Sequence, residues 1–170
     1  MTLVPARSVG VGVASNFRRA AHVSKGLRLM KERFGRMDIS RIYKSSDFSS
    51  EGAFYWNLAV KFESPLDLNE LKATLKSIEV SCGRLKYSKR SGRVCLDLDI
   101  LVMDGMDGMD GEEASWINGD LHSNLHGAFP LQDVLSERSQ VALGFTKHNF
   151  QSLFDIKVFR HRSIEWNRFL

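Results

Sequence analysis

The stretch Leu96-Asp97-Leu98-Asp99-Ile100 carries two carboxylates that alternate with three aliphatic side chains. Side chains two apart on a strand point to the same face, so this alternation predicts a strand with both aspartates on one surface and the aliphatic residues toward the core. Neighbouring carboxylates repel unless a cation lies between them, and Mg²⁺ is the usual cation for paired hard oxygens. The stretch therefore predicts either a magnesium site or the solvated face of a half-buried sheet.

A basic segment lies directly upstream of this strand. Between residues 84 and 93 the chain has no acidic residue, and its cationic side chains are Arg84, Lys86, Lys89, Arg90 and Arg93. Such a segment is most often a solvated surface, but beside a carboxylate pair it also suits the binding of phosphate. The two features together favour phosphoryl chemistry on a nucleotide.

Length and composition limit the number of domains and the kinds of partner that the chain can have. With 170 residues, of which 43% are hydrophobic, the chain fits a single domain over residues 1–170. The formal charge of +4 permits an anionic partner without demanding one. The two cysteines, Cys82 and Cys95, lack metal-ligand spacing, so we expect reduced packing thiols and a cytoplasmic protein. No apolar run matches a signal peptide or the roughly 18 residues of a membrane span.

Hydrophobic spacing predicts the order of elements up to about residue 103. Strands are expected over residues 9–13, 39–43, 54–62 and 94–103, and helices over 17–34 and from Asp67 or Asn69 to Cys82, with Gly83 at the stop of the second helix. The resulting β-α-β-β-α-β order predicts an α+β fold. Its expected architecture is a ferredoxin-like antiparallel sheet with both helices packed on one face.

The chain changes character after this core, which spans about residues 8–103. Three copies of Met-Asp-Gly over residues 103–111 predict an acidic surface loop. A calcium site is the more specific alternative, although the spacing of the aspartates lacks the pattern of a calcium-binding hand loop. Residues 130–170 are expected to form a C-terminal extension that completes the core with a strand and a terminal helix.

Five blocks of the sequence carry a resemblance to a known family. They are Ala14-Ser15-Asn16, Ile42-Tyr43, Tyr55-Trp56-Asn57-Leu58-Ala59-Val60, Ile78-Glu79 with Gly83-Arg84, and Leu96-Asp97-Leu98-Asp99-Ile100-Leu101. In this order and at these separations they resemble 6-hydroxymethyl-7,8-dihydropterin pyrophosphokinase of folate biosynthesis. The resemblance implies a ferredoxin-like fold and transfer of the β,γ-diphosphate of ATP to the pterin hydroxymethyl group with two Mg²⁺ ions.

The same resemblance implies roles for individual side chains. Asp97 and Asp99 match the carboxylates that hold both magnesium ions. The positions that match the pterin side are Ser45, Phe48, Tyr55, Asn57 and Phe129. The positions that match the ATP side are Glu79, Arg84, Arg90 and His122, and catalytic roles are implied for Arg84, Arg93 and His122 with the two aspartates. An amide such as that of Asn57 costs about 1–3 kcal/mol if it is buried without a partner, so we expect a ligand or backbone partner there.

Several positions depart from the family pattern. Ser91 stands in place of a tryptophan that stacks on the pterin, Arg93 lies one position early, and Ala14 replaces a glycine where backbone approaches substrate. In the Leu121–Phe129 segment the family proline is lost and His126 stands where an arginine belongs. These departures leave open a divergent paralogue that binds pterin or nucleotide with weak or altered transfer.

A basic RNA-binding module is a third interpretation. We do not favour it, because an RNA-binding sheet exposes aromatic side chains on its central strands, whereas the exposed pair here is acidic. The expected partners are therefore ATP and a pterin, without nucleic acid or membrane, and the expected state is a monomer or weak dimer.

Overall fold

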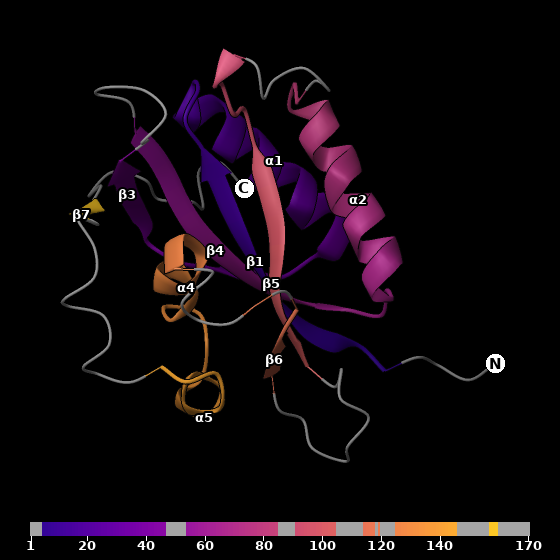
Figure 1. The fold of residues 1–170 in the computed structure, drawn as a ribbon. Helices are drawn as coiled ribbons and strands as arrows, with labels where there is room; N and C mark the ends of the chain where they lie inside the picture. The colour runs from indigo at the N-terminus through magenta and orange to yellow at the C-terminus, as the bar shows by residue number, and fades with distance from the viewer. Residues whose placement is uncertain are drawn as a thin grey trace.

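An antiparallel sheet organises the chain (Figure 1). The computed structural model describes residues 5–46, 54–84, 91–104, 114–117, 119, 125–145 and 157–159. The strands are β1 (Arg7–Ser15), β2 (Met37–Ile39), β3 (Ile42–Ser46), β4 (Phe54–Ser64), β5 (Asp97–Asp104), β6 (Ala114–Trp116) and β7 (Lys157–Phe159). The helices are α1 (Arg19–Phe34), α2 (Leu68–Ser81), α4 (Leu125–Leu131) and α5 (Glu137–Ala142). The strand order is β6-β5-β1-β4-β3-β7, and β2 also pairs with β4.

The predicted α+β class is confirmed, with two changes in the strands. The strand expected over residues 39–43 is divided into β2 and β3 around Ser40. There the Ser40 hydroxyl accepts a hydrogen bond from the Ala59 backbone N–H at 2.8 Å, which takes the place of a ladder bond. The last core strand begins at Asp97, three residues later than expected. The ferredoxin-like label stays a prediction, because β6 and β7 extend the sheet beyond the expected pattern.

Each face of the sheet carries its own apolar core. The first core lies under α1 and α2, as expected. It buries Leu96, Leu98 and Ile100, the aliphatic residues that alternate with the two aspartates. The second core lies on the opposite face, where Ala128 and Leu131 of α4 pack with residues of β4 and β5. Figure 1 shows α4 on the face away from α1 and α2. Helix α4 therefore packs on the face that carries the two aspartates.

Local signals set the ends of α2 as the sequence predicts. Asp67 accepts hydrogen bonds from the backbone N–H groups of Asn69 and Glu70, each at 2.8 Å, and the Glu70 carboxylate accepts from the Asp67 N–H at 3.0 Å. This capping box satisfies N–H groups that a helix start leaves open. At the other end Gly83 has φ of 94°, a conformation that glycine adopts without strain. Cys82 is a buried free thiol beside this turn.

Candidate active site

Strand register brings the predicted site residues onto one row across the sheet. Asp97 of β5 lies opposite Ala14 of β1, Ala14 lies opposite Asn57 of β4, and Asn57 lies opposite Tyr43 of β3. Side chains directly opposite each other on paired strands point to the same face. Asp99 follows on the next row, opposite Gly12. The carboxylates and the amide thus share the α4 face.

A hollow of about 200 Å³ opens on this face between the sheet and α4. Its lining residues are Gly12, Val13, Ala14, Asn57, Leu58, Asp99, Leu101, His126 and Gly127. Asp99 and Asn57, which the sequence singled out, therefore border one space. Ala14 is part of the same wall, and it stands where the family pattern has a glycine.

The amide side of the hollow is built by β3 and β4. Asn57 is buried, and its Nδ2 donates a hydrogen bond to the Ser45 hydroxyl at 2.7 Å, so its observed partner is a side chain and not backbone. Tyr55 lies opposite Ser45 in the ladder and is half-buried. Three of the residues expected on the pterin side therefore lie together on two neighbouring strands.

The carboxylate side contains a chain of ion pairs. Glu79 of α2 is only 2% exposed, and its Oε1 lies 2.6 Å from Arg84 Nη1 while it accepts a hydrogen bond from the Leu98 backbone N–H at 2.8 Å. The same Arg84 nitrogen donates to Asp97 Oδ1. Arg84 thus bridges the end of α2 and the first aspartate of β5.

The charged groups of these ion pairs also affect the pKa of Asp99. Loss of hydration, together with the nearby charges of Asp97 and Glu79, raises the pKa of Asp99. Burial opposes the charge of Arg84, but the hydrogen bond to Asp97 and the surrounding carboxylates outweigh it and raise the pKa of Arg84. Among the described residues, the three carboxylates Glu79, Asp97 and Asp99 lie near two cations, Arg84 and Lys76, and the remaining negative charge favours a further cation beside the aspartates.

The donor set suits Mg²⁺ in particular. In the part of the chain that the structure describes, no group of three or more His, Cys, Asp or Glu side chains could hold a metal ion. Asp97 and Asp99 offer two carboxylates on one face of β5. Mg²⁺ is commonly held by one or two carboxylates and takes its other ligands from water and substrate phosphates.

Residues 92–94, at the end of the basic segment, are held against the end of β1 by Asn16. Its Nδ2 donates to the Gly92 carbonyl at 2.7 Å, and its Oδ1 accepts from the Val94 N–H at 2.6 Å. Arg93 is exposed, and its guanidinium carbon lies 5.0 Å from the centre of the Phe17 ring. The expected site residues Phe48, Arg90 and His122 lie outside the described residues, as does the Met-Asp-Gly repeat beyond Asp104.

The two ring-bearing side chains of α4 have different neighbours, and the stacking role expected for Phe129 stays a prediction. Phe129 packs beside Tyr43, with 6.2 Å between ring centres, and it is not among the residues that line the hollow. His126, one turn earlier, lines the hollow instead. Burial lowers the pKa of His126, which favours a neutral imidazole. Sequence reasoning did not place Gly12, Leu101 or Gly127 in the site, because they carry no chemical signature and only the register brings them there.

The model of the 7,8-dihydro-6-hydroxymethylpterin-pyrophosphokinase family matches residues 9–137, which is more than half of the chain. No curated protein matches the chain. Among the described helices, none has the length and apolar character to cross a membrane.

Proposed function

Because the chain belongs to the 7,8-dihydro-6-hydroxymethylpterin-pyrophosphokinase family, we propose that it transfers the β,γ-diphosphate of ATP to 6-hydroxymethyl-7,8-dihydropterin with Mg²⁺. The observation that carries the proposal is the shared hollow, which Asp99 borders from β5 and Asn57 from β4. A metal-bound polyphosphate and a flat heterocycle can therefore meet on one face of the sheet.

Asp97 and Asp99 are the residues that would hold Mg²⁺. When bound there, the metal neutralises charge on the transferring phosphoryl oxygens. Arg84 is already fixed beside Asp97 by its ion pair with Glu79 at 2.6 Å. A phosphate bound through Mg²⁺ beside Asp97 would lie within reach of a guanidinium that loses little freedom on binding.

Asn57, Ser45 and Tyr55 form the proposed pterin side. An amide presents a donor and an acceptor together, which matches the edge of a pterin ring. The hydrogen bond from Asn57 to Ser45 fixes the orientation of that amide before substrate arrives. Orientation in advance lowers the entropy that binding has to offset.

A divergent paralogue that binds ligand with weak transfer is the second candidate. The observations that favour it are the Ala14 methyl in the wall of the hollow and the contact of Arg93 with Phe17. The Ala14 methyl takes up space in the hollow, and the contact with Phe17 draws Arg93 away from a phosphate. Ser91 offers no ring that could stack on a pterin.

Release of AMP from MgATP and 6-hydroxymethyl-7,8-dihydropterin tests the two candidates. Under the first, Asp97→Asn and Asp99→Asn each lower the rate by about 10²–10³-fold, because each removes a metal ligand. Asp38→Asn is the matched control, since Asp38 is an exposed carboxylate of β2 that pairs with Lys61 at 3.7 Å. No AMP from the wild type, with binding of ATP or pterin still seen by calorimetry, would support the paralogue, and no binding of either would reject both.

A further inference from the structure

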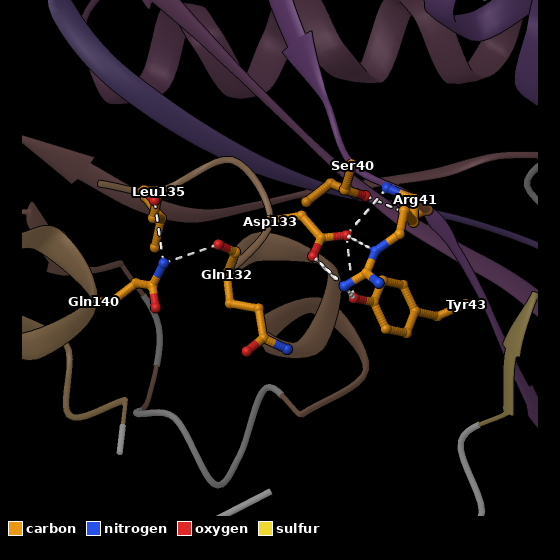
Figure 2. Close-up of polar contacts among 8 residues, drawn as sticks. Ser40, Arg41, Tyr43, Gln132, Asp133, Leu135 and Gln140 are labelled. Atoms are coloured by element: carbon orange, nitrogen blue, oxygen red, sulfur yellow. Dashed lines mark hydrogen bonds and ion pairs between the residues drawn. The ribbon is translucent and has the colours of Figure 1, made fainter. Parts of the chain in front are cut away.

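A polar cluster joins β3 to the segment that follows α4 (Figure 2). Arg41 donates from Nε to Asp133 Oδ2 at 3.0 Å and from Nη2 to Asp133 Oδ1 at 2.7 Å, and the Arg41 backbone N–H donates to Oδ2 at 3.1 Å. The Tyr43 hydroxyl lies 3.1 Å from each Asp133 oxygen. We call Arg41, Tyr43 and Asp133 the α4 anchor.

The anchor has the features of a strong contact. Paired N–H donors of one guanidinium on one carboxylate give both attraction and directional specificity. The Asp133 side chain is 14% exposed and Tyr43 is 2% exposed, while the Arg41 side chain is 53% exposed, so solvent reaches the ion pair mainly from its arginine side. Burial, with the charge of Asp133, raises the pKa of Tyr43 to about 12, so the phenol stays protonated at neutral pH.

The anchor lies beside the proposed pterin side. Tyr43 pairs directly with Asn57 in the β3–β4 ladder, and the Phe129 ring of α4 packs beside it. At the other end of the same helix, His126 and Gly127 line the hollow. Whatever sets the position of α4 on the sheet thus also sets the distance between the hollow's wall and the Asn57 amide.

Helix α4 is too short to be stable without its tertiary contacts. It has seven residues, from Leu125 to Leu131, with Pro130 inside it. Ala128 and Leu131 supply an apolar contact, which attracts without fixing direction. Gln140 of α5 binds the same segment through the carbonyls of Gln132 and Leu135, at 3.0 and 3.1 Å (Figure 2).

We propose that Asp133 is a positioning residue for the pterin substrate. It acts by holding α4 over the sheet so that His126 and Gly127 complete the hollow opposite Asn57. This inference rests on the proposed function for the identity of the ligand. The position of the helix itself does not depend on that function.

The test compares pterin and nucleotide binding in Asp133 variants. We expect Asp133→Ala to weaken binding of 6-hydroxymethyl-7,8-dihydropterin by about tenfold or more, since a small displacement of a binding wall has effects of this size. Affinity for MgATP should fall much less, because the described residues proposed for the nucleotide side, Glu79, Arg84 and Asp97, lie on or beside α2 and β5. Asp133→Asn keeps one carbonyl acceptor for Arg41, so its loss should be smaller. Asp38→Ala, which removes another exposed sheet ion pair, is the control.

Backbone hydrogen exchange of residues 126–131 gives a second measurement that needs no ligand. Asp133→Ala should speed exchange in α4 while leaving α1 and α2 unchanged. If exchange in α4 stays at the wild-type rate, or if pterin and MgATP affinities fall by the same factor, the anchor proposal is wrong. If the wild type binds no pterin, the proposed function fails, and the exchange measurement still decides whether Asp133 holds α4.

Discussion

Glu79 shows at the scale of one residue how the site is stabilised. It lies in the last turn of α2, where the helix dipole disfavours an anion, and it is almost fully buried. Arg84 at 2.6 Å and Lys76 at 2.9 Å offset both costs, and the Leu98 N–H adds a hydrogen bond. One carboxylate therefore links α2, the basic segment and β5.

We expect Glu79→Ala to lower the free energy of unfolding by about 1.5–3 kcal/mol, because it removes hydrogen bonds of a buried carboxylate to Arg84 and to the Leu98 N–H while Arg84 keeps Asp97 as its partner. Lys76→Ala, which removes the exposed partner, should cost less than about 1 kcal/mol. Urea unfolding measures both. Equal losses of unfolding free energy in the two variants would contradict the expectation that a buried ion-pair partner contributes more to stability than an exposed one.

Tyr43 gives a pH-dependent prediction. Its pKa is about 12 in the folded chain against 10.0 ordinarily, so the stability that the neutral phenol contributes is fully present below pH 10 and is lost as the pH rises toward 12. The stability of wild type relative to Tyr43→Phe should therefore fall by up to about 3 kcal/mol over this range. Unfolding of both proteins at pH 8, 10 and 11.5 measures the difference, and a constant difference would refute the shift.

At the scale of elements, close approach of α4 to the sheet depends on Gly127. A Cβ at this position would lie 2.5 Å from Leu101 Cδ1, which is closer than atoms in contact allow. Gly12 faces the same leucine from β1, with 3.1 Å for its Cβ. The hollow is therefore shaped by two residues without side chains around one leucine.

We expect Gly127→Ala to destabilise the fold by about 1–3 kcal/mol, as overpacking of a filled core does. Leu101→Ala removes the clashing methyl groups, so the double variant should be more stable than the sum of the two single changes predicts. A double-mutant cycle from thermal unfolding measures this coupling. Additive changes would mean that α4 shifts freely and that the glycine is not required for its position.

At the scale of the whole molecule, one sheet with a core on each face places the proposed nucleotide side and the proposed pterin side on different elements. The α2–β5 junction carries Glu79, Arg84 and Asp97, while β3, β4 and α4 surround the Asn57 amide. Bound ligands would therefore connect parts of the chain that are distant in sequence. Binding should stabilise the molecule as a whole.

MgATP at about one hundred times its Kd should raise the unfolding free energy by about 2.7 kcal/mol, which corresponds to about 5–10 °C in Tm for a chain of this size. Removal of Mg²⁺ with a chelator should abolish most of the shift, and Asp97→Asn should do the same in the presence of Mg²⁺. Calorimetric melting curves with and without ligand measure it. A full shift without Mg²⁺ would argue against the metal role of the aspartates.

Much of the fold could be predicted because its signals are local. The alternation from Leu96 to Ile100 sets which side chains are buried, and the Asp67 capping box with Gly83 sets the ends of α2. The division of the strand at Ser40 could not be predicted, since it depends on a hydrogen bond to Ala59 on another strand. The same holds for the partner of Asn57, which is a serine hydroxyl twelve residues earlier.

By itself the sequence predicted the α+β class and the shared face of Asp97 and Asp99, since periodicity acts over a few residues, and its motifs carried the resemblance to the family. Only the tertiary structure decided which side chains line the hollow and that Asp133 holds Arg41, 92 positions away. Such contacts follow from strand register and from the packing of α4 on the sheet, which depend on many residues at once. No pattern near either residue carries that information.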